Sequence, residues 1–266
     1  MFTALATVIA RNTSVIFDFV VVDEAQDLSV AHLRLLSALG GGRPNALFFA
    51  GDVGQRIFQQ PFSWKSLGVD VRGRSRTLRV NYRTSHQIRT QADRLLGPAL
   101  TDVDGIGEDR NDTVSVFNGP PPTVRSFASE DEESEAIAAW LVEHSEAGVM
   151  PHEFGVFVRS AAQLDRARAA AKRSAMAFKV LDEQVETTSG HISISTMHLA
   201  KGLEFRAVVV MACDDEVLPL QQRIETVGDD ADLKEVYETA RARDHLFVSG
   251  VAPVSKFLDD LIDRNV

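Results

Sequence analysis

The chain of 266 residues contains a single cysteine, Cys213, and therefore cannot form an internal disulfide. A lone thiol in an apolar run is typical of proteins kept in a reducing cytoplasm. No apolar run approaches the roughly eighteen residues that a membrane-spanning helix needs. The first residues also lack the basic start and continuous apolar core of a secretion signal. We therefore expect a cytoplasmic protein that makes no membrane contact.

Basic residues are in deficit, with 28 Lys and Arg against 38 Asp and Glu, which gives a net charge of −10. This balance excludes a protein coated with basic charge for nucleic-acid binding, although a local basic groove on an acidic body stays open. The apolar content of 44% is enough for one large domain or two smaller ones.

Short apolar runs alternate along the chain with longer segments of helical spacing. This alternation predicts βαβ units and an α/β fold, in which parallel sheets are flanked by helices. A stretch rich in Gly, Pro, Asp and Asn, at 97–123, is predicted to be an exposed loop. The predicted strands are 15–22, 46–50, 155–158, 191–196, 206–212 and 245–251, and the predicted helices are 28–39, 131–145, 161–175 and 255–262.

Acidic side chains follow the first predicted strand, in VVVDEAQD. Asp23 and Glu24 stand side by side where a buried strand ends, and like charges so close are usually tolerated for a cation or a proton transfer. An ordinary polar turn is the alternative. The second predicted strand ends in GDVGQRIF, where Gln55 could hold a water or a phosphate oxygen. Because parallel sheets bind ligands at the carboxyl ends of their strands, we expect these groups to gather around one cation.

Three further segments place polar and aromatic groups beside strands. In LRVNYRT, Tyr82 offers a flat face for a base and Arg83 a fork for phosphate oxygens. YETARARDHL places Arg241 and Arg243 just before the last predicted strand. TMHLAKGLEF forms a turn between two strands that is richer in functional groups than a connector needs, and it holds Thr196, His198, Lys201, Gly202 and Glu204.

Five of these segments occur in the order of the later motifs of the UvrD/Rep-like superfamily-one ATP-dependent DNA helicases, which the chain resembles over nearly its whole length. The resemblance implies RecA-like domains, with the C-terminal part of the first at 1–75 and a compact second at 76–266. It also implies ATP hydrolysis coupled to 3′–5′ movement on single-stranded DNA. The segments are VVVDEAQD, GDVGQRIF, LRVNYRT, TMHLAKGLEF and TARARDHL.

The resemblance assigns a role to each matching residue around ATP and Mg²⁺. Asp23 would hold Mg²⁺ through its water shell, and Glu24 would orient and deprotonate the attacking water. Gln55 is similar to the γ-phosphate sensor. Arg83 and Arg241 resemble the pair of arginines that neutralise the transferred phosphoryl group.

The same resemblance implies contacts to the nucleoside and to DNA. Tyr82 would stack on adenine, and Glu204 would contact the ribose, with Gly202 beside it. Trp64 stands where the family uses aromatic platforms for bases, with ordinary core packing as the alternative. Arginines between 72 and 83 would track the DNA backbone or form a solvated strand face. The expected DNA contacts are Trp64, Thr196, His198 and Lys201.

The sequence departs from the family pattern in three places. It contains no Gly-x-x-x-x-Gly-Lys-Ser/Thr, so the backbone cradle, the lysine and the Mg²⁺-binding hydroxyl of a P-loop are missing. Ala240 stands where Thr is expected, which leaves Arg241 and Arg243 as alternatives for the phosphate contact. The large accessory domain of many relatives is missing or vestigial.

We therefore expect the isolated chain not to hydrolyse ATP. It would be the C-terminal portion of a helicase, one half of a split enzyme whose P-loop comes from a second chain, or a non-catalytic remnant that binds DNA or a partner protein.

Overall fold

The structure is a computed structural model in which the chain divides into two compact units. Unit 1 comprises residues 1–78 with 99–111, and unit 2 comprises 79–98 with 112–266. The parts of the chain that the structure describes are 2–10, 16–40, 42–51, 63–96, 99–101, 107–109, 113–200, 202–218, 242–256 and 258.

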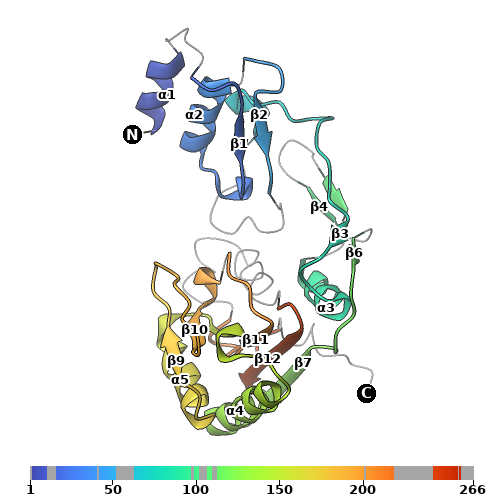
Figure 1. Cartoon of the computed structure of the whole chain (residues 1–266), viewed down its shortest axis with the longest axis vertical. Coiled ribbons are helices and arrows are strands. Elements are labelled where there is room, and N and C mark those ends of the chain that lie inside the picture. The colour runs from blue at the N-terminus through green and yellow to red at the C-terminus, as the bar shows by residue number, and fades with distance from the viewer. Residues whose placement is uncertain are drawn as a thin grey trace. The chain divides into compact units, whose positions relative to one another are not determined.

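Unit 1 is built around a pair of short parallel strands, β1 and β2, beside two packed helices, α1 and α2 (Figure 1). Val21 of β1 lies opposite Phe48 of β2. A second pair, β4 and β5, is antiparallel. The elements of unit 1 are α1 (Phe2–Ala10), β1 (Val20–Val22), η1 (Ala25–Asp27), α2 (Val30–Gly40), β2 (Leu47–Phe49), η3 (Lys65–Leu67), β4 (Ala99–Thr101) and β5 (Gly107–Asp109).

One face of the β1–β2 pair is apolar and open to solvent. Val21 and Phe48 are 60% and 62% exposed, and Phe19, just before β1, is 66% exposed. The helix side is covered, since Leu33 of α2 is fully buried. Large exposed apolar faces and unpaired strand edges promote association with other chains.

We therefore expect the purified chain to self-associate through this face of unit 1. Replacing Val21 and Phe48 together by threonine should shift the chain toward monomer in sedimentation velocity, because threonine suits a strand but removes apolar surface. The matched control is Met150→Thr, which removes one exposed apolar side chain from unit 2. A wild-type chain that is monomeric across the concentration range would contradict the prediction.

Unit 2 contains a six-stranded sheet in which every neighbouring pair is parallel, in the order β7-β12-β11-β8-β10-β9. A separate parallel pair joins β3 to β6. The elements of unit 2 are β3 (Val80–Asn81), α3 (His86–Leu96), β6 (Val114–Ser115), β7 (Thr123–Phe127), α4 (Glu130–Glu146), η4 (Pro151–Glu153), β8 (Phe154–Val158), η5 (Ala161–Gln163), α5 (Leu164–Arg173), β9 (Phe178–Val180), β10 (Ile192–Thr196), η6 (Met197–Leu199), β11 (Ala207–Val210) and β12 (His245–Val251).

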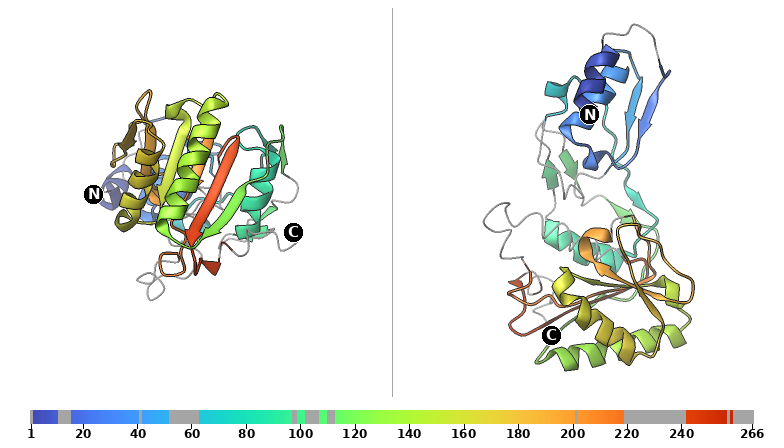
Figure 2. Two further views of the ribbon diagram at one scale, coloured as in Figure 1. Left: turned by 90° about the horizontal axis from the view of Figure 1, so that it is seen from below. Right: turned by 90° about the vertical axis from the view of Figure 1, so that its left-hand side faces the viewer.

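The central strands of this sheet are buried on both faces. In β11, Val208 packs in the cluster that contains Ile88 of α3, whereas Val209 packs in the cluster that contains Ile137 of α4 and Ala170 of α5. Figure 2 shows α4 and α5 side by side over the sheet. This two-sided burial explains why the strand sequences are continuous apolar runs rather than alternating ones.

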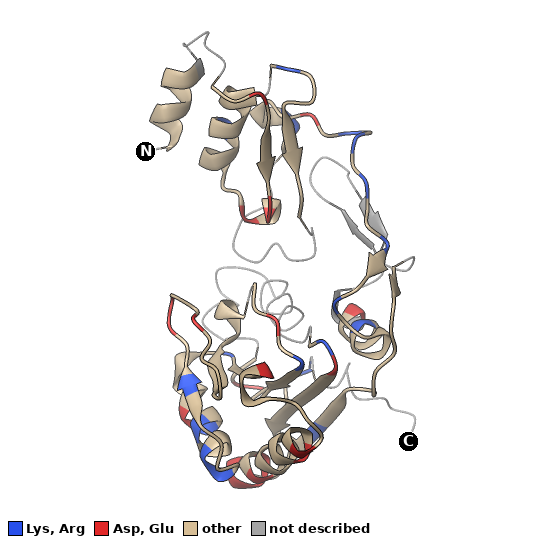
Figure 3. Ribbon diagram, viewed as in Figure 1, with Lys and Arg blue, Asp and Glu red and all other residues tan. Residues whose placement is uncertain are grey.

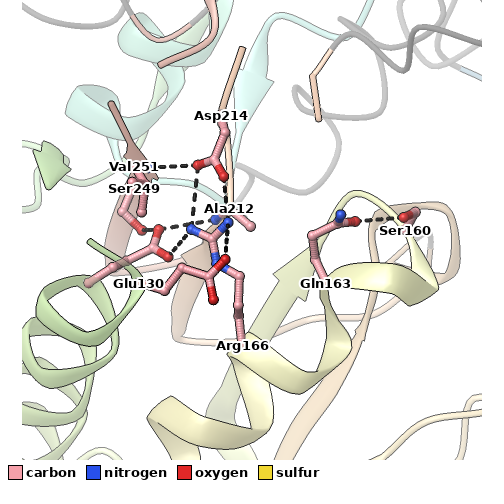
Figure 4. A network of polar contacts seen from close by, with 9 residues as sticks. Glu130, Ser160, Gln163, Arg166, Ala212, Asp214, Ser249 and Val251 are labelled. Carbon is pink, nitrogen blue, oxygen red and sulfur yellow. Dashed lines mark hydrogen bonds and ion pairs between the residues drawn. The ribbon is translucent and has the colours of Figure 1, made fainter. Parts of the chain in front are cut away.

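An ion network lies where α4, α5, β11 and β12 meet (Figure 4). Arg166 of α5 donates to Glu133 of α4 and to Asp214, each at 2.5 Å. The fully buried Glu133 carboxylate also accepts from the Ser249 hydroxyl at 2.7 Å and from the Ala212 backbone N–H at 3.1 Å. Burial lowers the pKa of Arg166, but the hydrogen bonds and charges of Asp214 and Glu133 outweigh it, so the pKa lies above its ordinary value.

Figure 3 shows acidic residues along α4 and basic residues along α5. The first turn of α4 is acidic, which suits the positive end of the helix dipole. Ser129 caps this helix by accepting from the Glu132 backbone N–H at 3.2 Å. Arg173 at the end of α5 pairs with Asp131 of α4. The two helices are thus joined at the surface as well as in the core.

The predicted α/β class is confirmed, because the main sheet is parallel and flanked by helices. Each of the six predicted strands contains an observed strand or coincides with one to within a residue. The loop predicted at 97–123 is wrong in part, since β4, β5 and β6 lie in it. Strands of two or three residues are too short to show a period in sequence. The predicted helix 255–262 lies mostly outside the described residues.

Cys213 is buried and free, and burial raises the pKa of its thiol. In the described part of the chain, no helix is long and apolar enough to cross a membrane.

Candidate nucleotide and nucleic-acid site

Asp23 and Glu24 follow β1 at the edge where β1 and β2 both end. The two strand ends are joined by backbone hydrogen bonds of 2.8 Å, from Ala50 N–H to the Val22 carbonyl and from Ala25 N–H to the Ala50 carbonyl. Both acidic side chains are exposed. Asp23 and Glu24 therefore lie at the carboxyl end of a parallel strand, as predicted from the sequence.

The backbone beside these carboxylates is held in a strained conformation. Glu24 has a φ of 51°, in the left-handed region that a side chain disfavours. Its carboxylate accepts from the Gln26 amide at 2.5 Å, and the Asp23 carboxylate accepts from the Glu24 N–H at 2.9 Å. A Cβ at Gly51 would lie 2.5 Å from the Gln26 side-chain oxygen and 3.0 Å from the Ala25 backbone nitrogen, so a larger residue here would displace the Gln26 side chain. Sequence reasoning gave no role to Gln26, although it lies inside the acidic motif.

The donor set at this edge suits a divalent cation held through water. Carboxylate oxygens are the ligands that Mg²⁺ prefers, and it usually keeps several waters. Among the described residues, no group of three or more His, Cys, Asp or Glu side chains could form a complete metal cage. The exposed carboxylates of Asp23 and Glu24 could hold Mg²⁺ through water. Gln55 lies outside the described residues.

In unit 2, Tyr82 and Arg83 follow β3. Tyr82 is 73% exposed, with its ring open to solvent. The Arg83 guanidinium donates to the Leu203 carbonyl at 2.7 Å and lies 3.2 Å from the Glu204 carboxylate. The structure therefore brings together two residues, Arg83 and Glu204, that are 121 positions apart and that the family resemblance assigns to one nucleotide.

The segment between β10 and β11 joins two strands that lie on either side of β8 in the sheet. Thr196 ends β10 and is buried, whereas His198 on η6 is exposed. Gly202 has a φ of +80° and open space around it, and Glu204 comes shortly before β11 begins. Of the expected DNA contacts on this segment, His198 is the one presented to solvent, and Lys201 lies outside the described residues.

Trp64 precedes η3 in unit 1 and is half-buried. Its ring meets the Phe49 ring edge-on, with centroids 4.9 Å apart. This contact agrees with the packing alternative, while the partial exposure leaves a ring surface for a base.

Two of the arginines between residues 72 and 83 make hydrogen bonds with neighbouring side chains. Arg72 donates to both carboxylate oxygens of Asp70, at 2.9 and 2.6 Å, and this contact holds the pKa of Asp70 well below its ordinary value. Arg74 donates to the side-chain oxygen of Asn45 at 2.5 Å. These contacts favour a solvated face for both residues.

Arg241 lies outside the described residues, and Arg243 is exposed. The Arg243 side chain lies 3.3 Å from the Asp244 carboxylate, and its backbone N–H donates to the Phe205 carbonyl at 3.0 Å.

Comparison with known proteins gives matches in both units. Residues 2–63 match the UvrD/REP helicase N-terminal domain, and residues 174–252 match the UvrD-like helicase C-terminal domain. The ATP-dependent DNA helicase UvrD1 of Mycobacterium leprae (strain TN) is 38% identical over 73 residues, which are 26% of this chain and 9% of that protein. The chain thus matches less than a tenth of that helicase.

Among solved structures, the C-terminal domain of a possible DNA helicase from Lactobacillus plantarum WCFS1 is similar, with a TM-score of 0.47 and 17% identity. The match covers 69% of this chain and 95% of that one. The two family matches follow one another in chain order, one in each compact unit. The chain is therefore identified as UvrD/Rep-like, with parts of the N-terminal and the C-terminal helicase domains.

Proposed function

We propose that the chain contributes to an ATP-dependent DNA helicase in which ATP hydrolysis drives 3′–5′ movement along single-stranded DNA. The observation that carries the proposal is the exposed Asp23–Glu24 pair. It lies at the carboxyl edge of two parallel strands, inside the segment that matches the UvrD/REP N-terminal domain.

The acidic pair would act on the phosphate end of the nucleotide. When bound, Mg²⁺–ATP supplies the phosphoryl group and the cation that screens its charge. Asp23 would hold the cation through water, and Glu24 would orient a water and take its proton. Gln55 would report on the γ-phosphate. Phosphoryl transfer depends mainly on positioning and charge stabilisation, which suits a site built from fixed carboxylates.

Unit 2 would supply the opposite charge and the nucleoside contacts. Arg83 and Arg241 would stabilise the phosphoryl group, and the exposed Tyr82 ring would stack on adenine. Glu204 would accept from the ribose, with Gly202 beside it.

A second class of function is favoured by a specific observation, namely that the sequence has no P-loop motif. The chain would then be one half of a split helicase whose P-loop comes from a second chain, or a cytoplasmic remnant that binds DNA or a protein. The genomic frame upstream separates these: a P-loop segment there favours a split enzyme, and its absence favours a remnant.

The proposed movement along DNA predicts that the chain binds DNA weakly, that salt weakens this binding, and that single strands are preferred over duplex. Net negative charge opposes binding, while local arginines release counterions from the backbone. Fluorescence anisotropy of labelled single-stranded DNA should show that the affinity of the chain for DNA falls steeply between about 50 and 200 mM salt. The steepness of this fall should correspond to a few phosphate contacts. Trp64→Ala should weaken binding and Trp64→Phe should retain most of it, because a phenyl ring still stacks. Equal, salt-insensitive binding to duplex would oppose the proposal.

The ATPase half is tested by measuring Mg²⁺-dependent turnover with the P-loop absent and with a P-loop segment joined to the chain. ATP hydrolysis that depends on both the P-loop segment and Glu24 supports the proposal. ATP hydrolysis that does not depend on Glu24 contradicts it.

A further inference from the structure

The Arg83 side chain is already occupied within unit 2. Its guanidinium donates to the Leu203 carbonyl at 2.7 Å, and its Nε lies 3.2 Å from a Glu204 carboxylate oxygen. The positive charge that would meet a phosphate is therefore neutralised by a neighbour from a distant segment.

The backbone beneath Arg83 is fixed independently of this pair. The Asn81 side-chain oxygen accepts from the N–H groups of Arg83 and Thr84, at 2.8 and 3.1 Å. Ser85, which is fully buried, donates its N–H to the Arg243 carbonyl at 3.2 Å. A change at the guanidinium can therefore occur without rebuilding the turn that presents it.

The two charged groups themselves are accessible. The Arg83 side chain is 39% exposed and the Glu204 side chain 72% exposed. Exposed ion pairs contribute little to stability because water competes for both partners. A phosphate group accepts two parallel hydrogen bonds from a guanidinium and is a stronger partner than one carboxylate oxygen. Phosphate can thus replace Glu204 at a small free-energy cost.

We propose that Glu204 masks Arg83 until a phosphate-bearing ligand displaces it, a contact that we name the Arg83–Glu204 latch. This proposal rests on the proposed function, since the ligand there is a nucleoside triphosphate. The displacement does two things at once: it exposes Arg83 to the phosphate, and it frees the Glu204 carboxylate to accept from a ribose hydroxyl. Glu204 is therefore a gating residue as well as a nucleotide contact.

The test uses the full chain, labelled with ¹⁵N-arginine, and inorganic pyrophosphate as the probe. The Arg83 Nε–Hε signal is assigned by its loss in Arg83→Lys. Pyrophosphate should shift this signal in the wild type, and Glu204→Gln should bind pyrophosphate about two- to fivefold more tightly, the range that an exposed ion pair contributes. Glu216→Gln is the matched control, because it removes one exposed negative charge elsewhere in unit 2. It should raise the affinity less than Glu204→Gln does.

Three results would overturn the latch. These are an affinity of Glu204→Gln equal to or below the wild-type value, an equal gain in Glu216→Gln, or an Arg83 signal that pyrophosphate leaves unchanged in every protein. In the first two cases, a wild-type shift at Arg83 leaves its phosphate role in the proposed function standing. In the third case that role fails as well.

Discussion

Replacing Glu133 by alanine should lower the free energy of unfolding of unit 2 by roughly 3–5 kcal/mol, the range measured when one partner of a buried ion pair is removed. Glu133 is fully buried and accepts hydrogen bonds from Arg166, Ser249 and the Ala212 backbone. Its loss leaves the buried Arg166 charge to Asp214, at 2.5 Å, and to the exposed Glu130, at 3.7 Å. The measurement is urea unfolding followed by Trp140 fluorescence in a Trp64→Phe background, so that the signal reports unit 2.

Three variants make this prediction specific to the network. Glu135→Ala removes an exposed acidic residue from the same helix and should change stability by less than about 0.5 kcal/mol. Glu133→Gln keeps part of the hydrogen bonding and should fold even if the alanine variant does not. The double variant Glu133→Ala with Arg166→Ala should lose less than the sum of the single losses, because neither member of the buried pair is left without the other. Additive losses would show that the pair is not coupled.

The purified chain is expected to show no Mg²⁺-dependent ATP hydrolysis, with or without single-stranded DNA. The reason is chemical: no stretch of its sequence supplies the backbone N–H cradle and lysine that bind the β- and γ-phosphates. The carboxylates at the end of β1 could still hold Mg²⁺ through water, but the phosphates would lack most of their contacts. The measurement is phosphate release at saturating ATP.

When a P-loop segment is joined to the chain, Glu24→Gln should reduce turnover by roughly 10²–10⁴-fold, the contribution of a general base. The same change on an exposed residue of unit 2, Glu216→Gln, serves as control and should leave turnover unchanged. Robust turnover by the unmodified chain that Glu24→Gln abolishes would refute the requirement for a P-loop. It would then follow that residues of this sequence bind the phosphates in another way.

The sequence alone determined the class of the fold and the chemical identity of the candidate groups. Continuous apolar runs between helical segments predicted parallel strands, because a strand buried on both faces has no polar side to alternate with. The acidic pair could be placed at the end of β1 for the same reason: the run of valines stops at Asp23. The predicted helix 131–145 matches α4 to within one residue at each end. Both signals for this helix, its apolar period and its acidic first turn, depend only on residues close together in the sequence.

Some elements of unit 2 were not predicted from the sequence. Helix α3 was not predicted, and among its described side chains Ile88 and Ala92 are the buried apolar ones that mark its inner face. Strand β6 was not predicted either: it pairs with β3 over only two residues, so the partner, rather than a periodic pattern, decides that it is a strand.

Only the tertiary structure decided which side chains meet. Nothing in the sequence indicates that Arg83 contacts Glu204 and Leu203, that Gln26 fills the space beside Gly51, or that Glu133 balances Arg166 from another helix. Local patterns fix burial and element type because they depend on neighbours a few residues apart. Contacts between segments 30 to 120 residues apart depend on how the strands order themselves in the sheet, and that order is set by the packing of the whole unit.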